Sequence, residues 1–275
     1  MNARTPARTT LPAADPAAAV FARVLIGVDE TDAGYEACRQ ALRLAPAGAE
    51  LEAAAVAPLA EAVWAGPTAG RVAEDLLRDC HAALEEALRI LGQATESKVL
   101  SGSPASALIR EIERTGATLV AVGSHGRRRA AEIALGGTAG ELLHTAPCSV
   151  LVAKTPGGRE RFPRRIVAGI DGSLESDRAL DVAQELATRL GAELRTVTAV
   201  GGKDVDLAHV HLRSPLAEEI DRHPVDALVA ASRRADLLVV GSRGLHGLRA
   251  LGSVSERVAH QAACSTLVVR PSADA

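Results

Sequence analysis

The sequence predicts an α/β protein with two open parallel sheets, one in each half of its 275 residues. Three observations lead to this fold class. Short apolar runs alternate with helical patterns, the same order of segments occurs twice, and the first apolar run of each half ends at an acid. Strand–helix–strand repeats of this kind build parallel sheets through right-handed crossovers. We therefore expect two Rossmann-like lobes, each with a five-stranded sheet and flanking helices.

An internal repeat divides the chain. RVLIGVDETD at 23–32 matches RIVAGIDGSL at 165–174, and three further pairs of segments follow in the same order. The segment between the repeats, TPGGRERFPR, is rich in Gly, Pro and charge, as linkers are. We expect a disordered tail at 1–22, a first domain at 23–154, a linker at 155–164 and a second, shorter domain at 165–275.

Each half contains five segments that suit strands. The first of each half is almost fully apolar, which is typical of a strand buried in a parallel sheet. In the helix that follows, Thr31 or Asp32 is the expected N-cap in the first half, and Ser173 in the second. Gly191 is expected to end the second of these helices. The expected strands are 23–28, 51–56, 98–101, 118–122 and 149–153, then 165–170, 194–199, 216–220, 236–240 and 265–269.

The two halves differ in length. Asp29 and Asp171 are 142 residues apart, whereas Pro104 and Pro224 are only 120 apart, so the second half lacks 22 residues in this interval. In the first half the interval includes a long amphipathic helical pattern. We expect one crossover helix of the second lobe to be missing or reduced. An uncovered face costs about 25 cal/mol for each Å² of apolar surface left in water.

Composition excludes several classes of function. Aromatic residues make up 1% of the chain and the net charge is -3, so neither a base-stacking platform nor a basic surface for nucleic acid is available. No apolar run reaches the ~18 residues of a membrane helix. None of the four cysteines forms a C-x-x-C pair, and Cys148 and Cys264 are expected to be small buried thiols. We expect a cytoplasmic protein without a nucleic-acid or membrane partner.

Candidate binding residues follow the first and fourth strands of each half. Ligands of open parallel sheets bind outside the carboxyl ends of the strands, where the strand order reverses. Asp29 and Asp171 directly follow the first strands, although each could instead cap its helix. Glycines and then a helix N-terminus with free N–H groups follow the fourth strands, a combination that suits phosphate. These glycines are Gly123, Gly126 and Gly136 in the first half, and Gly241, Gly244 and Gly252 in the second.

This combination resembles the universal stress protein family in its tandem form, over nearly all of residues 23–270. The family's nucleotide motif is G-2x-G-9x-G-(S/T). The first half has both spacings, but Gly137 stands in place of Ser or Thr, and Thr138 comes one residue later. The second half keeps Ser253 after Gly252, but its spacer is two residues short. The resemblance implies a fold like the adenine nucleotide alpha hydrolases, and ATP, AMP or ADP, with Mg²⁺, as the ligand.

The resemblance also implies a role for each matching residue. Asp29 would contact the adenosine moiety, and the main chain of Val56 would contact adenine. The first-half glycines, together with Gly137 and Thr138, would hold ribose and phosphates. No catalytic residue and no metal ligand is predicted. The corresponding nucleotide-binding set in the second half is Asp171, Ala199, Gly241, Gly244, Gly252, Ser253 and Ser255.

The leading hypothesis is a stress-response protein in which nucleotide binding is regulatory. One alternative is a member that binds no nucleotide and acts as a dimeric interaction scaffold, which Gly137 and the short spacer at 245–251 favour. Another is a slow ATP-hydrolysing enzyme, for which no general base stands out. The fifth strands, SVLVAK and STLVVR, are apolar and would be exposed edges. We expect them to pair with each other in an intramolecular pseudo-dimer, and two chains could associate further as a homodimer.

Overall fold

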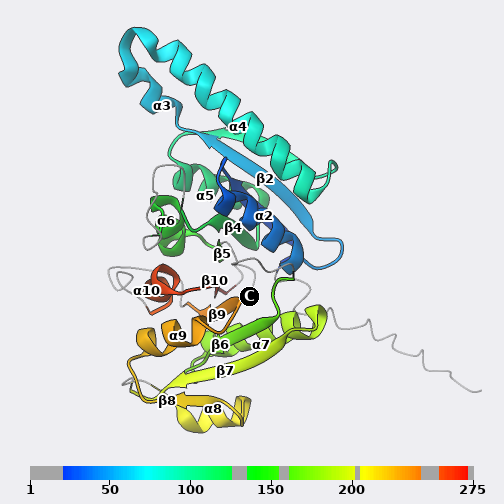
Figure 1. Cartoon of the computed structure of the whole chain (residues 1–275), viewed down its shortest axis with the longest axis vertical. Coiled ribbons are helices and arrows are strands. Elements are labelled where there is room, and N and C mark those ends of the chain that lie inside the picture. Colours follow the sequence, from blue (N-terminus) through cyan, green and yellow to red (C-terminus); the bar gives the residue numbers. More distant parts are fainter. Residues whose placement is uncertain (1–20, 126–134, 155–160, 202–204, 243–253, 272–275) are drawn as a thin grey trace, which may run out of the picture.

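The computed structural model describes residues 21–125, 135–154, 161–201, 205–242 and 254–271. Lobe 1 contains β1 (Arg23–Val28), β2 (Glu50–Ala57), β3 (Glu96–Ser101), β4 (Leu119–Gly123) and β5 (Ser149–Ala153). Lobe 2 contains β6 (Arg165–Gly169), β7 (Glu193–Ala199), β8 (Glu218–Ile220), β9 (Leu237–Gly241) and β10 (Ser265–Val269). Together they form one sheet in the order β3-β2-β1-β4-β5-β10-β9-β6-β7-β8 (Figure 1). The strand order therefore reverses at β1 in lobe 1 and at β6 in lobe 2.

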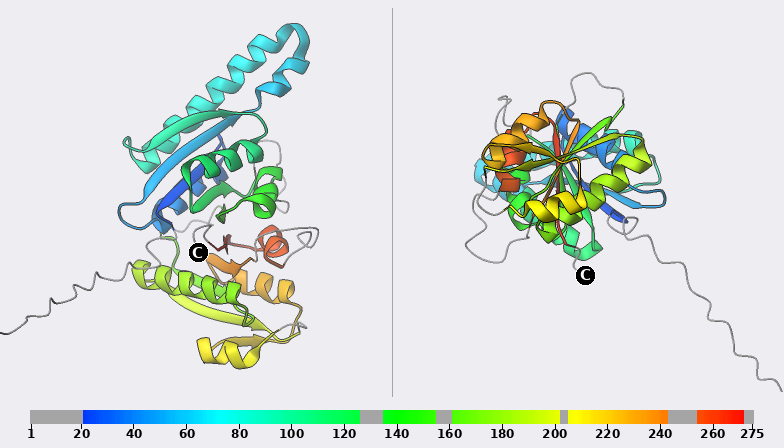
Figure 2. Two further views of the ribbon diagram at one scale, coloured as in Figure 1. Left: turned by 180° about the vertical axis from the view of Figure 1, so that it is seen from behind. Right: turned by 90° about the horizontal axis from the view of Figure 1, so that it is seen from below.

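Helices cover both faces of this sheet (Figure 2). The helices α2, α4, α7 and α8 pack on one face, and α5, α6, α9 and α10 on the other. Lobe 1 has α2 (Asp32–Leu44), α3 (Leu59–Ala62), η1 (Val63–Thr68), α4 (Ala69–Leu91), α5 (Pro104–Thr115) and α6 (Gly137–Thr145). Lobe 2 has α7 (Leu174–Leu190), α8 (Leu207–Arg213), α9 (Pro224–Ser232) and α10 (Val254–Gln261).

Two apolar clusters, one on each face, run through both lobes. Along β1, Val24 and Ile26 belong to one cluster and Leu25 to the other, because successive strand side chains point to opposite faces. The apolar residues of β1 are buried on both faces, as its continuous apolar pattern predicts, whereas Arg23 at its start is exposed. The predicted α/β fold class, with parallel strands and flanking helices, is confirmed.

Capping residues set the starts of the helices that follow β1 and β6. Thr31 is the N-cap of α2, so that of the two expected candidates Thr31 and not Asp32 holds this position. Ser173 caps α7, and Gly191 ends it in the left-handed conformation, with φ of 62°. Both of these predictions are confirmed.

The two lobes join through their fifth strands. β5 and β10 are antiparallel, with Leu151 opposite Leu267, whereas the strand pairs within each lobe are parallel. The predicted intramolecular pseudo-dimer is therefore present in the chain. Each apolar edge covers the other, which removes two aggregation-prone strand edges from solvent.

A cationic residue directly follows each fifth strand and caps the C-terminus of a helix in the other lobe. Lys154, after β5, donates through its ammonium group to the carbonyl of Ala262, just beyond α10. Arg270, after β10, donates through its guanidinium to the carbonyls of Leu143 and Ala146 at the end of α6. These cations satisfy carbonyl groups that a helix leaves without partners at its C-terminus.

The lobes differ most in one crossover. In lobe 1 the chain passes from β2 to β3 through α3, η1 and the 23-residue α4, which extends beyond the sheet (Figure 1). In lobe 2 the corresponding connection holds the seven-residue α8, and β8 has only three residues. The predicted reduction of this helix is confirmed. Leu212 of α8 and Leu216, which follows the helix, are 77% and 94% exposed, so apolar surface remains in water.

The remaining sequence expectations concern thiols and membranes. Cys148 and Cys264 are buried thiols outside any disulfide, as predicted, and so are the other two cysteines. Burial raises the pKa of Cys38 and of Cys148 to about 12. Among the helices that the structure describes, none combines the length and the apolar character needed to cross a membrane.

Candidate functional site

The aspartates after β1 and β6 hold the turns that start α2 and α7. Asp29 Oδ1 accepts hydrogen bonds from the main-chain N–H of Thr31, at 3.3 Å, and from its hydroxyl. The Thr31 hydroxyl in turn accepts from the N–H of Gly34 at 3.0 Å. The alternative of direct helix capping by Asp29 is therefore wrong, because Asp29 orients the capping residue instead. Within the described part of the chain, no group donates a hydrogen bond to Asp29 Oδ2.

Lobe 2 repeats this turn. Asp171 Oδ1 accepts from the N–H and hydroxyl of Ser173, at 3.0 and 2.6 Å. The hydroxyl of Ser173 then accepts from the N–H of Ser176 at 3.2 Å. Gly34 and Ser176 occupy matching positions, and a Cβ on Gly34 would lie 2.5 Å from Asp29 Oδ1. The carboxylate of Asp29 therefore lies against the main chain of α2 at Gly34, whereas α7 carries the side chain of Ser176 at the matching position.

The glycines that end β4 and β9 have a packing role. A Cβ on Gly123 would lie 2.7 Å from the carbonyl carbon of Ala33, and one on Gly241 would lie 2.3 Å from the carbonyl oxygen of Glu175. Both contacts are with the main chain of the first turn of a helix. A glycine at each position thus lets α2 or α7 approach the sheet closely. The sequence assigned these glycines to a ligand. In the structure, close packing of the helix on the sheet is a second reason for glycine at both positions.

The start of α6 offers unpaired N–H groups. Gly136 is its N-cap and provides no side-chain cap, while its own N–H donates to the carbonyl of Ser124 at 2.8 Å. Among the described residues, none accepts from the N–H groups of Gly137 and Thr138. A Cβ on Gly137 would meet nothing within 4 Å, so space is open beside this turn. Such a turn suits an anion.

Asp29 and the start of α6 belong to the same edge of the sheet. β1 and β4 are neighbours, with Gly27 opposite Val122, so Asp29 and Ser124 follow the two strands at equivalent positions. On the other side of β1, β2 continues past its last pair with β1 at Ala55, which leaves Val56 at this edge. Lobe 1 therefore brings together Asp29, Val56, Gly123, Gly136, Gly137 and Thr138 along three neighbouring strand ends.

In lobe 2 the chain covers part of the equivalent edge. The N–H of Asp206 donates to the carbonyl of Asp171 at 3.0 Å. A Cβ on Gly172 would lie 2.8 Å from the carbonyl oxygen of Asp206, so the two segments are in close contact. Ala199 is buried at the end of β7. The shortened connection therefore returns over the end of β6, at the position where Asp29 follows β1 in lobe 1.

Several predicted residues lie outside the described residues, namely Gly126, Gly244, Gly252 and Ser253. Ser255 is described and is buried in the first turn of α10. In the described ranges, no group of three or more His, Cys, Asp or Glu side chains is arranged to hold a metal ion.

Sequence reasoning missed one aromatic ring near this edge. Tyr35 lies in the first turn of α2 and is half-buried. Burial and the carboxylate of Glu30 raise the pKa of Tyr35, and Asp29 adds to the effect. Its position six residues after Asp29, in a helical pattern, was the available signal. The low aromatic content of the chain concealed this signal.

Comparisons with known proteins agree with one another. The family model described as "Universal stress protein family" matches residues 21–154, 163–221 and 217–270. A universal stress protein of Mycolicibacterium smegmatis is 30% identical over 292 residues, covering 90% of this chain and 97% of the relative. One from Mycobacterium tuberculosis is 31% identical over 208 residues, covering 65% of this chain and 70% of the relative.

A solved structure has the same fold. The crystal structure of a universal stress protein from Archaeoglobus fulgidus matches with a TM-score of 0.70 and 20% identity. The match covers 93% of this chain and 100% of the other. Two lobes joined in one chain are therefore shared with a protein of quite different sequence.

Proposed function

Because the chain belongs to the universal stress protein family, we propose that it is a stress-response protein that binds an adenine nucleotide, ATP or its di- or monophosphate, in lobe 1. The observation that carries this proposal is the open edge of lobe 1. There a carboxylate oxygen without a donor and a helix start with unpaired N–H groups follow neighbouring strands.

The residues present fit such a ligand. The free Oδ2 of Asp29 can accept from ribose hydroxyls or from an amino group of the base, and the main chain of Val56 is within the same edge. The N–H groups of Gly137 and Thr138 suit phosphate oxygens. Gly137 lacks the hydroxyl of the family motif, a loss worth about 0.5–1.5 kcal/mol of one hydrogen bond, which Thr138 can offset. Mg²⁺ would accompany the phosphates.

The proposed role is regulatory. Bound nucleotide at 100-fold its Kd adds about 2.7 kcal/mol of stability, which is enough to change the population of a partner-binding state. Asp29 and Asp171 both serve helix turns, and we assign neither of them to proton transfer. We place the protein in the cytoplasm, where its four cysteines, none of which forms a disulfide, would stay reduced.

A matched pair of variants tests the proposal. Asp29→Asn keeps an oxygen for Thr31 but replaces the free acceptor by an amide donor, and Asp171→Asn makes the same change in lobe 2. Equilibrium dialysis with labelled ATP and Mg²⁺ should show binding to the unaltered protein. Asp29→Asn should weaken it about tenfold or more, since a hydrogen bond to a charged group contributes about 1.5–3 kcal/mol. Asp171→Asn should leave it nearly unchanged.

Three outcomes would overturn the proposal. Absence of binding below about 1 mM ATP, in protein shown to be folded, would favour the scaffold alternative. Equal loss in both variants would remove the assignment to lobe 1. Turnover of ATP that both variants abolish would favour the enzyme. The homodimer stays a prediction, and sedimentation at micromolar concentration checks it.

A further inference from the structure

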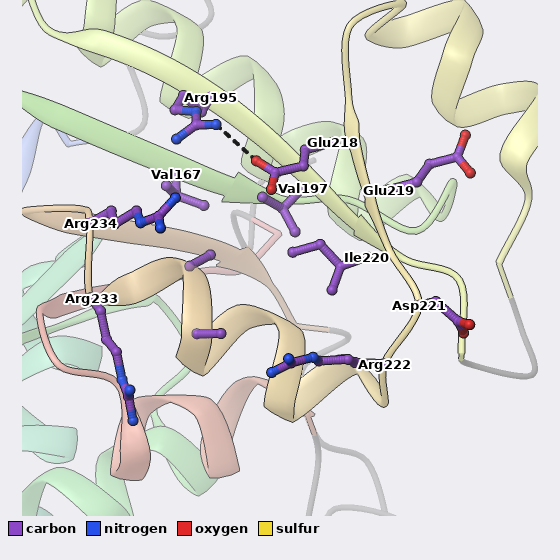
Figure 3. A pocket seen from close by; sticks show the side chains of 12 residues that line it. Val167, Arg195, Val197, Glu218, Glu219, Ile220, Asp221, Arg222, Arg233 and Arg234 are labelled. Carbon is purple, nitrogen blue, oxygen red and sulfur yellow. Dashed lines mark hydrogen bonds and ion pairs between the residues drawn. The ribbon is translucent and has the colours of Figure 1, made fainter.

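Lobe 2 contains a hollow that the nucleotide proposal does not use. It has a volume of about 550 Å³ and lies between β7, β8 and the C-terminal part of α9 (Figure 3). Val167, Val197 and Ile220 line it with apolar side chains. Its size falls within the range of small-molecule pockets. Arg195 and Arg234 also line it, from β7 and from the turn after α9.

The internal repeat shows what fills this place in lobe 1. The strand registers make Glu52 equivalent to Arg195 and Lys98 equivalent to Glu218. Counted from the first proline of each helix, Glu111 of α5 corresponds to Ala231 of α9, and Arg114 to Arg234. In lobe 1 these four positions form one charged cluster.

A carboxylate is the centre of that cluster. Glu111 Oε1 lies 2.6 Å from Arg114 Nη2 and 2.7 Å from Lys98 Nζ. The side chain of Glu111 is well covered, and the residue is 6% exposed. Hydrogen bonds from Arg114 and then from Lys98 lower the pKa of Glu111 to about 2. This place beneath the helix therefore holds an ionised carboxylate in lobe 1.

Lobe 2 keeps one cation of the cluster, Arg234 in place of Arg114, has Glu218 in place of Lys98, and lacks the central carboxylate. Ala231 stands in place of Glu111, and Arg195 replaces the second acid of the cluster. Arg195 pairs with Glu218 at 2.9 Å, whereas Arg234 has no carboxylate partner in the described part of the chain. In Figure 3 Arg195 and Arg234 lie on one side of the hollow, and the carboxylates of Glu219 and Asp221 lie on the opposite side.

We propose that this hollow binds a small organic acid with an apolar body. Its carboxylate would lie between Arg195 and Arg234, over Ala231, where lobe 1 has the carboxylate of Glu111. Its apolar body would pack against Val197 and Ile220. Arginine is well suited to this partner, because its planar fork matches a carboxylate with two parallel hydrogen bonds.

Binding of hexanoate to the full chain tests the proposal. We expect a Kd of about 1 mM by titration followed by NMR, a value reasonable for a ligand of this size. Acetate lacks the apolar body and hexanol lacks the charge, so each should bind at least tenfold more weakly. Inorganic phosphate should also bind weakly. Phosphate binding as tight as that of hexanoate, or equal binding of hexanol, would overturn the proposal.

Variants locate the site. Ala231→Glu restores the carboxylate of lobe 1, so it should fill the place with its own side chain and abolish hexanoate binding. Arg234→Gln should weaken binding at least tenfold. Arg178→Gln, an exposed arginine of α7 on the other face of the sheet, is the matched control and should have no effect. Undiminished binding in Arg234→Gln, or an equal loss in Arg178→Gln, would contradict the proposal even if Ala231→Glu did not fold.

Discussion

Lobe 1 and lobe 2 have the same strand order but use the same sheet edge differently. In both lobes the aspartate after the first strand keeps an oxygen, Asp29 Oδ2 or Asp171 Oδ2, to which no described group donates. In lobe 1 the chain leaves β2 through α3 and η1. In lobe 2 the shorter connection returns over the end of β6, where Asp206 binds the main chain of Asp171. A deletion in a crossover therefore changes access to a strand end that lies in a different segment. The two lobes of a tandem protein need not bind the same ligand.

The two lobes also differ on the face of the sheet that α5 and α9 cover, and there the difference is one of charge. Beneath α5 two acids and two bases form a closed cluster around Glu111. Beneath α9 Ala231 and Arg195 stand in place of the two acids, and Glu218 stands in place of Lys98. Two arginines and one acid remain at these positions, so the hollow has one positive charge in excess. Lobe 1 therefore fills the space beneath α5 with charged side chains, whereas lobe 2 has a hollow beneath α9. At the strand ends the relation is the opposite, because lobe 2 covers the end of β6 with its own chain.

The largest effect should come from the glycines at the ends of β4 and β9. Gly241→Ala should lower the free energy of unfolding by about 3 kcal/mol and Gly123→Ala by about 2 kcal/mol, because each new methyl group meets main chain that cannot move aside. Urea unfolding measures both. Gly137→Ala is the control, and it should be neutral or slightly stabilising because its Cβ meets nothing within 4 Å. Equal stability of all three variants would show that both glycines serve only a ligand.

The next effect concerns Arg270 and Lys154, the two cations that cap helices across the lobe junction, and we expect their loss to lower stability by different amounts. Arg270 is 6% exposed and satisfies two carbonyls, whereas Lys154 is half-buried and satisfies one. We expect Arg270→Met to cost about 2–3 kcal/mol of stability and Lys154→Met about 1 kcal/mol, since buried carbonyls lose their donors. Thermal and urea unfolding check this order. The reverse order would mean that α10, and not α6, depends more on its cap.

The third effect concerns the charged cluster around Glu111 and depends on pH. Glu111→Gln should cost about 1–2 kcal/mol at pH 7, through loss of hydrogen bonds to charged groups. The pKa of Glu111 is lowered from 4.5 to about 2 in the folded chain, so its contribution is fully present above about pH 4.5. The difference from the unaltered protein should shrink as the pH falls from 4.5 toward 2.

Unfolding at several pH values measures this difference. Glu113→Gln, an exposed acid of the same helix, is the control and should show little effect at any pH. A difference for Glu111→Gln that stays constant down to pH 2.5 would contradict the ionised cluster, and with it the template for the hollow of lobe 2.

Much of the fold could be predicted from the sequence, because its signals are local. The apolar runs at 23–28 and 149–153 are observed as β1 and β5 with the same bounds. The weaker run at 216–220 is shortened to β8, Glu218–Ile220, where the sheet has only one neighbouring strand. The pairing of the fifth strands was also predictable, because two apolar edges of one chain remove each other from water.

The site was predictable in part. The sequence identified Asp29 and Gly136 as edge residues, since both directly follow or precede a recognisable element. It could not show that Asp29 leaves one oxygen free, that Gly123 packs against α2, or that Asp206 lies on Asp171. Those facts depend on the path that each connecting segment takes across the strand ends, and this path is set by contacts between residues far apart in the chain.

By itself, then, the amino-acid sequence determined the elements, their repeat and the family, because helix and strand periods and caps act between residues close in the chain. The tertiary structure decided that the chain covers the end of β6 and not that of β1. It also decided that Arg234 has no carboxylate partner among the described residues. Ala231 is unremarkable as a residue of a helix. It marks a hollow only once β7, β8 and α9 place Arg195 and Arg234 around it, and such meetings are set by contacts between distant segments.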